Sequence, residues 1–342
     1  MRQIMTMKSI KKGKQNCYQN HNQFIILIYC KIMKVLITGG AGQIAYALIP
    51  LLLSGNIFGN NMIDLNLLDI EFCKDRLEGV KMEINDSNFS HLNNLVTTTD
   101  VKTAFKDVDV AILLGGFPRK KGMLRKDLLE KNFMIFKEHG MALEKYASKD
   151  VKVLVVANPA NTNCWIADKF SPSIPSKNFT CLTYLDQERL RNLISKKYNL
   201  SYNDIKNVII WGNHSNTQVP DISYINHENI ELSNEDIKKI QTRGASVIQK
   251  RGMSSAFSAA QAIKKHLNVW FNGTNELVSL GVKSFGEFNI PKDIFISLPV
   301  NTSTFNYEIQ SNLEIDNKVK KLLEISIKEL EDEKEIVKKL LN

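Results

Sequence analysis

The sequence holds few of the residues that dominate fibrous, disordered or disulfide-rich proteins. Its 342 residues include only 8 prolines, 17 glycines and 5 cysteines, which excludes a collagen-like chain, a wholly disordered chain and a disulfide scaffold. No stretch is long and apolar enough for a membrane-spanning helix, which needs about 20 residues. The cysteines show neither CxxC nor metal-ligand spacing. Their odd number favours reduced thiols in a cytoplasmic protein without a bound metal.

Acidic residues are absent from the first 32 positions, although the chain as a whole carries a formal charge of +9. This segment contains six of the 45 Lys and Arg residues, so residues 33–342 hold 39 basic against 36 acidic residues, a net charge of +3. A nucleic-acid binder would need a basic face with interleaved aromatic residues. The segment offers only Tyr18, Phe24 and Tyr29 for that purpose. We therefore expect neither a nucleic-acid partner nor a membrane partner.

The first 32 residues allow three interpretations. The apolar run Phe24–Cys30 behind a basic start resembles a secretory signal, but Lys31 follows it and no Ala-x-Ala cleavage site is present. The lack of acidic residues suits an organelle transit peptide, but arginine is scarce. We favour an upstream in-frame extension, with Met33 as the functional start directly before a predicted strand. Residues 1–32 are then expected to be disordered or outside the functional enzyme.

The body alternates short apolar runs with helical stretches, which predicts an α/β fold with a parallel sheet covered on both faces. We expect a Rossmann-type, doubly wound domain over residues 33–185, followed by an α+β substrate and catalytic domain over residues 186–342. Predicted strands are Lys34–Thr38, Leu65–Asp69, Asp109–Leu114, Lys152–Val156 and Thr180–Tyr184, with β-rich residues at 277–299. Predicted helices are Gln43–Leu53, Lys126–Tyr146, 233–268 and 316–341.

A glycine-rich turn joins the first predicted strand to its helix and predicts a dinucleotide site. Gly39 allows a tight turn, Gly42 lets the backbone approach a pyrophosphate, and Ala45 lets the helix pack close to the strand. The second strand ends at Asp69, 24 residues after Ala45, which suits a carboxylate that binds the adenine ribose hydroxyls. A carboxylate there repels a 2′-phosphate, so NAD is expected rather than NADP.

Three later segments carry charged side chains at or near the ends of predicted strands. Arg119 and Arg125 lie in a loop with Gly and Pro, Asp186 and Arg189 share a helix face, and His214 follows the apolar run Val208–Trp211. Taken singly, these fit a solvated basic loop, a capping pair and a structural histidine. Taken together, they fit a ligand site at the carboxyl end of an α/β sheet.

The combined motifs resemble the lactate/malate dehydrogenase family, and within it the cytosolic type of malate dehydrogenase. The resemblance runs from Met33 to near the C-terminus and includes Arg243-Gly-Ala and Ser254-Ser-Ala-Phe-Ser-Ala-Ala260. Its most specific segments are Thr38-Gly-Gly-Ala-Gly-Gln-Ile-Ala-Tyr46, Gly122-Met-Leu-Arg-Lys-Asp-Leu-Leu129, Asn158-Pro-Ala-Asn-Thr-Asn-Cys164 and Ile209-Ile-Trp-Gly-Asn-His-Ser-Asn-Thr-Gln218. It implies an NAD-dependent oxidation of (S)-malate to oxaloacetate by a cytoplasmic homodimer of central carbon (tricarboxylic acid cycle) metabolism.

The resemblance also implies roles for single residues. His214 would exchange the hydroxyl proton of malate, and Asp186 would orient the imidazole. Arg189 would bind the carboxylate beside the reacting carbon, and Arg125 would polarise the carbonyl oxygen. The remaining substrate contacts would come from Arg119 and Asn158, and the cofactor contacts from Gly39, Gly42, Gln43, Ile44, Asp69, Asn132 and His139.

Arg119 separates the possible substrates. A dicarboxylate needs a second cation, whereas a lactate-specific enzyme of this family carries an uncharged residue at that position. Burying Arg119 unpaired against pyruvate would be costly, so oxaloacetate is the expected substrate. The alternatives are a lactate or other 2-hydroxyacid dehydrogenase and a non-catalytic NAD-binding module on the same fold.

Several positions depart from the cytosolic pattern. His139 stands where glutamine is usual, Tyr184 replaces an arginine, Gln187-Glu188 replace His-Asn, and Lys121 replaces an acid. A histidine at position 139 introduces either a titrating group near NAD or a neutral ring that replaces the amide hydrogen bond.

Overall fold

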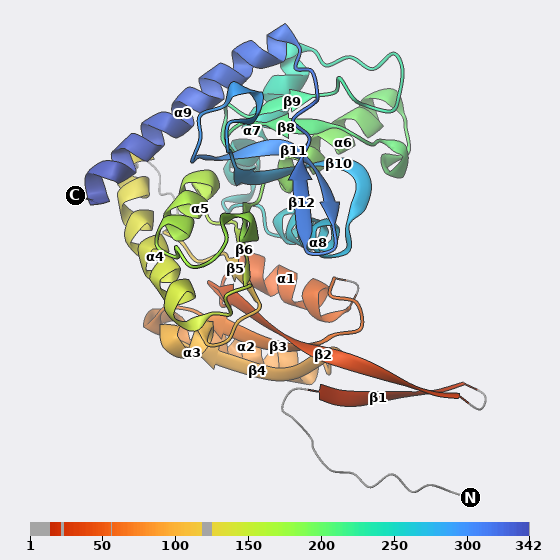
Figure 1. Ribbon diagram of the computed structural model, residues 1–342, viewed down its shortest axis with the longest axis vertical. Coiled ribbons are helices and arrows are strands. Elements are labelled where there is room, and N and C mark those ends of the chain that lie inside the picture. Colours follow the sequence, from red (N-terminus) through yellow and green to blue (C-terminus); the bar gives the residue numbers. More distant parts are fainter. Residues whose placement is uncertain (1–13, 22–23, 56, 118–124, 342) are drawn as a thin grey trace, which may run out of the picture.

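A parallel sheet forms the centre of the N-terminal half (Figure 1). The computed structural model describes residues 14–21, 24–55, 57–117 and 125–341, and for residues 14–30, 125 and 126 only the backbone path enters the description. The strands lie in the order β4-β3-β2-β5-β6-β7, which confirms the predicted doubly wound sheet. Their bounds are β2 Phe24–Thr38, β3 Met62–Leu68, β4 Leu92–Thr98, β5 Val110–Leu113, β6 Lys152–Val155 and β7 Phe179–Cys181.

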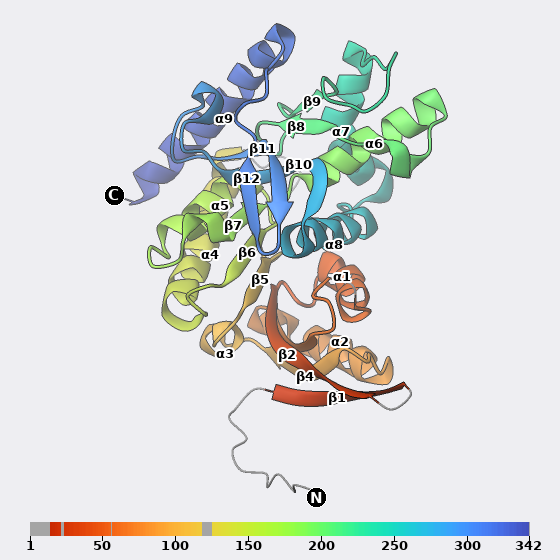
Figure 2. The same ribbon diagram turned by 45° about the vertical axis from the view of Figure 1, so that its right-hand side comes forward.

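The strands form two separate cores because successive side chains point to opposite faces of the sheet. On β2, Val35 and Ile37 belong to one core, and Leu36 belongs to the other. Figures 1 and 2 show the helices that cover the two faces on opposite sides of the sheet. The first face carries α1 Gln43–Leu53, α2 Lys74–Asp86 and α8 Phe257–Asn272, and the second carries α3 Val101–Phe105, α4 Arg125–Tyr146 and α5 Ala160–Lys169.

The C-terminal half extends this sheet and adds a small second one. Strand β10 lies antiparallel to β7 through the Gly281–Cys181 pair, and β11 and β12 follow it at the edge. The separate two-stranded sheet pairs β8 with β9. The elements of this half are α6 Tyr184–Tyr198, β8 Ile209–Trp211, β9 Val219–Asp221, α7 Asn234–Arg251, β10 Thr274–Lys283, β11 Phe295–Ser303, β12 Asn306–Ile309 and α9 Asn317–Leu341. Short 3₁₀ turns occupy Glu71–Cys73, Ser176–Asn178, Tyr202–Asp204 and Glu287–Asn289.

Two predicted elements differ from the structure. The helix expected over 233–268 is divided into α7 and α8, because Gly252 takes a left-handed conformation (φ 74°) that ends α7. The strand expected over Thr180–Tyr184 ends at Cys181, and Tyr184 instead begins α6. That shift puts Asp186 within the first turn of a helix at the carboxyl end of the sheet.

The part of the N-terminal segment that the structure describes is a hairpin rather than a disordered tail. Strand β1 (Lys14–His21) pairs antiparallel with the first half of β2, from Lys14 against Lys31 to His21 against Phe24. Strand β2 therefore begins well before the predicted Lys34 and projects beyond its neighbours β3 and β5 (Figure 2). Backbone hydrogen bonding between two extended segments supplies the order that composition did not predict.

Among the helices of the described residues, none has both the length and the apolar character needed to cross a membrane.

Candidate active site

The glycine-rich turn lies where the sheet order reverses, between β2 and its neighbours β3 and β5. Gly39 has φ 67°, and a Cβ at this position would come within 2.9 Å of the Gly115 Cα. The backbone N–H of Gly115 donates to Thr38 Oγ1 over 2.9 Å. The loops that follow β2 and β5 therefore touch through glycine backbone, and a side chain on Gly39 would separate them.

The first turn of α1 has the features of an anion site. Gly42 caps the helix without a side-chain hydrogen bond, and the described first turn, which includes Gln43 and Ile44, contains no acidic residue. Helix N-termini with free N–H groups favour phosphate. Gln43 is exposed, and its side chain reaches the second half of the chain: Nε2 lies 2.8 Å from Met253 Sδ, and Arg251 donates to Oε1 over 3.4 Å.

Asp69 fixes this turn from the end of the neighbouring strand. Its Oδ2 accepts a 2.9 Å hydrogen bond from the Ala41 N–H, and its Oδ1 accepts a 2.8 Å bond from the Ile70 N–H. A carboxylate has about four acceptor positions, so two bonds leave capacity for the two hydroxyls of a ribose. The uncapped α1, the glycine contact and this carboxylate together fit a dinucleotide.

Asn132 and His139 on α4 have different surroundings. Asn132 is fully buried, its Oδ1 accepts from the Phe117 N–H over 2.9 Å, and its Nδ2 donates to the Leu128 carbonyl over 2.9 Å. It therefore fixes the backbone that enters the 118–124 segment. The His139 ring lies between Phe105 and Phe136, each 5.6 Å away, and burial lowers its pKa to about 4. The ring is therefore neutral at neutral pH, and its Nδ1 has no hydrogen-bond partner among the described residues.

Asp186, Arg189 and His214 lie together around one buried carboxylate. Asp186 has no exposed surface; its Oδ2 lies 2.5 Å from His214 Nδ1, and its Oδ1 accepts from Arg189 Nη1 over 3.0 Å. Burial alone would raise the pKa of Asp186, but the adjacent His214 and Arg189 outweigh that effect and hold the pKa below its ordinary value. The carboxylate therefore remains charged, and it contacts His214 at Nδ1 rather than at Nε2.

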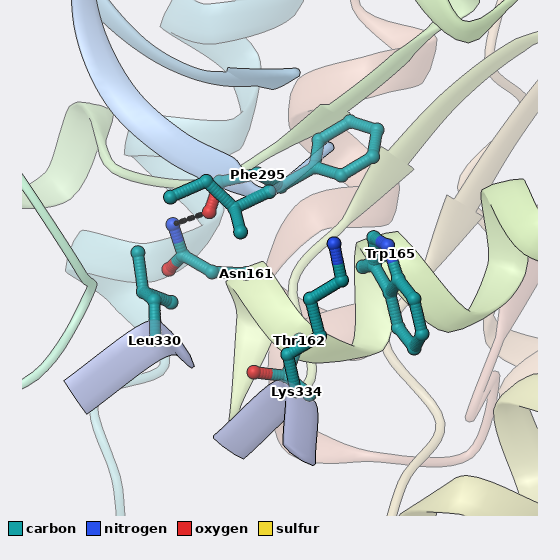
Figure 3. A pocket seen from close by; sticks show the side chains of 7 residues that line it. Asn161, Thr162, Trp165, Phe295, Leu330 and Lys334 are labelled. Atoms are coloured by element: carbon teal, nitrogen blue, oxygen red, sulfur yellow. Dashed lines mark hydrogen bonds between the residues drawn. The ribbon is translucent and has the colours of Figure 1, made fainter. Parts of the chain in front are cut away.

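Helices α5 and α9 support the His214 loop from behind. The His214 N–H donates to Asn161 Oδ1 over 2.9 Å, and Asn161 in turn donates to the Phe295 carbonyl over 3.0 Å, which Figure 3 shows beside Leu330 and Lys334 of α9. On α9, Ser326 Oγ accepts from the Asn213 N–H over 2.7 Å. The loop is thus held on both sides of the histidine.

Two glutamates of α9 complete this support. Asn213 Nδ2 donates to Glu329 over 2.9 Å and to Glu333 over 3.0 Å. Glu329 also accepts from Ser215 and Thr217, and Glu333 accepts from Thr162 of α5. Sequence reasoning missed Ser326, Glu329 and Glu333. Their spacing of three and four residues on the buried side of an amphipathic helix was the available signal.

The other predicted substrate residues are only partly described. Arg119 lies outside the described residues, and Arg125 begins α4 with its side chain outside the description. Asn158 is exposed just after β6, where the neighbouring Ala157 N–H bonds to the Leu113 carbonyl of β5. It therefore lies at the same edge of the sheet as the glycine-rich turn. The described residues contain no cluster of three or more His, Cys, Asp or Glu arranged to hold a metal ion.

Comparison with known proteins agrees with this geometry. A family model described as lactate/malate dehydrogenase, NAD binding domain, matches residues 33–180, and one described as lactate/malate dehydrogenase, alpha/beta C-terminal domain, matches residues 183–341. The cytoplasmic malate dehydrogenase of Taenia solium is 47% identical over 322 residues, which cover 89% of this chain and 97% of that protein.

Two solved structures are similar over almost the whole fold. The malate dehydrogenase from Naegleria fowleri superposes with a TM-score of 0.88 at 40% identity, covering 91% of this chain and 99% of that one. The Trichomonas vaginalis lactate dehydrogenase in complex with NADH and oxamate gives a TM-score of 0.86 at 34% identity, covering 90% and 99%.

Proposed function

The chain belongs to the lactate/malate dehydrogenase family, and from that premise we propose that it interconverts (S)-malate and oxaloacetate with a His214–Asp186 proton relay. It is an NAD-dependent oxidoreductase whose relatives are named malate dehydrogenases. The observation that carries the proposal is the single buried carboxylate of Asp186, shared between an imidazole and a guanidinium. A proton acceptor and a carboxylate-binding cation are thereby held side by side.

The glycine-rich turn and Asp69 would hold NAD, which would supply a hydride acceptor for the oxidation of malate. His214 takes the hydroxyl proton at Nε2, because Nδ1 faces Asp186, and the fixed carboxylate stabilises the resulting cation. In the reverse direction the same imidazole returns the proton to oxaloacetate. Its side chain is 16% exposed, so the ring is accessible from solvent although the preceding Gly212 and Asn213 are buried.

We assign the substrate contacts to the cations and the amide at this edge. Arg189, held by Asp186, presents its planar guanidinium to the carboxylate beside the reacting carbon. Arg125 polarises the carbonyl oxygen, Arg119 pairs with the distal carboxylate, and Asn158 contacts the substrate near the ring of NAD. The glycine-rich turn with Gln43 and Asp69 holds the dinucleotide, and Asn132 fixes the loop beside it.

One assay separates this function from its alternatives. Consumption of NADH, followed by absorbance, is measured with oxaloacetate and then with pyruvate. We expect turnover with oxaloacetate and a sharp loss of it in Arg119→Leu, because the distal carboxylate then has no cation. Preference for pyruvate would support the lactate enzyme, which the similarity to the Trichomonas vaginalis protein keeps as second candidate. No turnover with either would support a non-catalytic module.

We also propose that the chain forms a homodimer through α1, α2 and α8. Large apolar side chains are exposed on these elements: Tyr46 is 52% exposed, Met82 58% and Phe257 84%, and Phe72, in the 3₁₀ turn directly before α2, is 89% exposed. Tyr46 bonds to Glu83 of α2, and α1 packs on α8, so the side chains share one face. Sedimentation velocity should give a dimer, and Phe257→Asp combined with Met82→Lys should give a monomer. An unaltered dimer in the double variant would refute this face.

The cytoplasm is the proposed location, since the similar malate dehydrogenases of Medicago sativa, Taenia solium and Rattus norvegicus are named cytoplasmic. The proposed division into residues 33–185 and 186–342 leaves residues 1–32 outside the enzyme. Mass spectrometry of the native N-terminus tests it, because a start at Met33 would exclude the hairpin from the mature protein.

A further inference from the structure

The two members of the proton relay come from different elements. Asp186 lies in the first turn of α6, and His214 follows β8. Among the described residues, β8 pairs with β9, and one further bridge joins Gly212 to Ser297 of β11. A contact of 2.5 Å between two such side chains requires a third element that fixes α6 relative to β8. Strand β11 supplies one such contact, because Ser297 Oγ lies 2.9 Å from Thr183 Oγ1 and 2.7 Å from the Ile210 carbonyl, and strand β10 supplies another through Ser279.

Ser279 of β10 binds both elements at once. Its N–H donates to Gln187 Oε1 over 2.7 Å, and its carbonyl accepts from Thr183 Oγ1 over 3.0 Å. Gln187 follows Asp186 in the chain, and Thr183 caps the same helix. The Ser279 hydroxyl accepts a 2.8 Å bond from the N–H of Ile210, four residues before His214.

These contacts are shielded from solvent. Ser279 and Thr183 have no exposed surface, and Gln187 and Ile210 are each 1% exposed. Ile210 lies opposite Pro220 in the β8–β9 ladder, and its N–H donates to the hydroxyl of Ser279 on β10. Without water to replace a lost partner, this hydrogen bond determines where β8 lies relative to β10.

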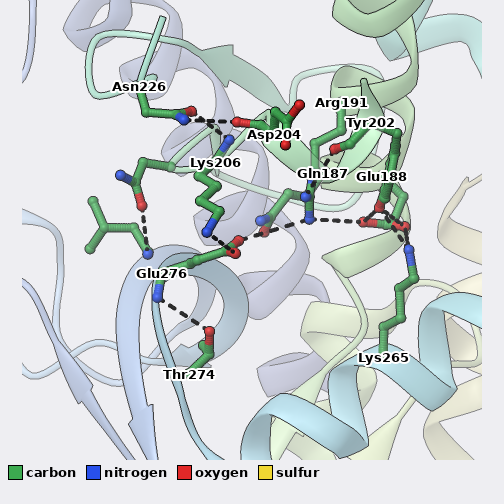
Figure 4. Close-up of polar contacts among 12 residues, drawn as sticks. Gln187, Glu188, Arg191, Tyr202, Asp204, Lys206, Asn226, Lys265, Thr274 and Glu276 are labelled. Carbon is green, nitrogen blue, oxygen red and sulfur yellow. Dashed lines mark hydrogen bonds and ion pairs between the residues drawn. The ribbon is translucent and has the colours of Figure 1, made fainter. Parts of the chain in front are cut away.

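Gln187 is one of the positions at which the sequence departs from the cytosolic pattern. Its neighbour Glu188 pairs with Lys265 of α8 and accepts from Tyr202, as Figure 4 shows. Glu188 thus fixes α6 on its outer side, whereas Gln187 connects the helix inward to Ser279. Of these two residues, Gln187 is the one whose partner, Ser279, also contacts β8, the strand that precedes His214.

We propose that Ser279 is a positioning residue that sets the geometry of the His214–Asp186 pair, with Gln187 as its partner on α6. This inference rests on the proposed proton relay. Ser279 touches neither substrate nor NAD; it acts by holding the acid and the imidazole at their mutual distance.

The test compares three variants with the full-length protein. Ser279→Ala removes the hydroxyl, Ser279→Thr retains one, and Ser171→Ala is the matched control. Ser171 is also fully buried and follows α5. Its hydroxyl donates to the carbonyl of Ala167 in that helix over 2.6 Å, not to Asp186 or His214. Each variant is examined by thermal denaturation, by kcat and KM for NADH and oxaloacetate, and by the pH profile of kcat.

For Ser279→Ala we expect kcat to fall about tenfold or more, because small misplacements of catalytic groups cost rate steeply. KM for NADH should stay unchanged, since the glycine-rich turn is untouched. The alkaline limb of the pH profile for oxaloacetate reduction should move to lower pH, because a more distant carboxylate stabilises the charged imidazole less. Ser279→Thr should recover part of kcat, and Ser171→Ala should alter stability alone.

The result that overturns the proposal is a Ser279→Ala enzyme with the kcat and pH profile of the wild type. If that variant does not fold, Gln187→Met removes the other contact of Ser279, the hydrogen bond from its N–H to α6, and unchanged kinetics there would equally refute the proposal. His214→Asn separates this inference from the proposed function. Full activity in His214→Asn overturns the relay itself, whereas an inactive His214→Asn beside a normal Ser279→Ala overturns the positioning role alone.

Discussion

Replacing Asp186 by asparagine tests the feature on which the proposed chemistry depends. The carboxylate has no exposed surface and serves two partners, His214 at 2.5 Å and Arg189 at 3.0 Å. Asparagine keeps the size of the side chain but removes its charge. Its NH₂ group replaces one of the two oxygens that now contact His214 and Arg189. The imidazole then loses the anion that stabilises its protonated form, and it loses control of its tautomer.

The magnitude follows from the strength of a hydrogen bond to a charged group, about 1.5–3 kcal/mol. If the bond to the imidazole is made fully only when His214 is protonated, its loss raises the barrier by that amount. At about 1.36 kcal/mol per tenfold change in rate, kcat/KM for oxaloacetate should fall by about 10- to 160-fold. Part of that loss reflects Arg189, whose position depends on the same carboxylate.

The assay is the initial rate of NADH oxidation, with Asp168→Asn as the control. Asp168 on α5 is also a buried acid, 7% exposed, and its Oδ2 accepts from Lys283 Nζ over 2.8 Å. Both variants lose a buried ion pair, but only one lies at the proposed site. Equal activity of Asp186→Asn and wild type, or equal losses in the two variants, would refute the reasoning.

Two further predictions concern α4 and α9. Burial lowers the pKa of His139 from 6.5 to about 4, so between these values the unfolded chain binds the proton more tightly and stability falls as the pH falls. The free energy of unfolding should therefore be roughly 2 kcal/mol lower at pH 5 than at pH 8 on account of this group. Urea titrations at both pH values should show that His139→Gln removes this contribution; the same pH difference in the variant as in the wild type would contradict the lowered pKa of His139. Glu333→Leu should lower the free energy of unfolding by about 1–3 kcal/mol, because Thr162 loses this acceptor and Asn213 Nδ2 keeps only Glu329. The variant should reduce kcat, whereas NADH affinity, measured by fluorescence titration, should not change.

The sequence predicted the regular parts of the nucleotide-binding half closely. Helix α1 has the predicted bounds Gln43–Leu53, since its limits follow from local features, a glycine turn before it and an apolar stripe along it. Strand β5 and helix α4 were predicted to within one residue at each end. A buried parallel strand and an amphipathic helix each have a distinct apolar pattern, and tertiary contacts did not override it here.

The failures have tertiary causes. The helix over 233–268 was predicted as continuous, but α7 ends at Arg251, Gly252 has a left-handed backbone, and α8 begins only at Phe257. The β1–β2 hairpin depends on pairing between segments that look unstructured one at a time. The supports of the site, Ser279 and Glu333, were missed because the sequence does not identify the partner of a buried polar residue. Ser279 bonds to Ile210, 69 residues away, and Glu333 bonds to Asn213, 120 residues away.

The place of α9 in the chain has a consequence for the order in which the enzyme is made. Synthesis proceeds from the N-terminus, and folding follows it in the same direction. The glycine-rich turn, Asp186 and His214 all leave the ribosome before Ser326, Glu329 and Glu333, yet the loop that carries His214 is held by these three residues. A nascent chain can therefore complete its dinucleotide-binding half while the loop that carries His214 still lacks its hydrogen bonds to α9.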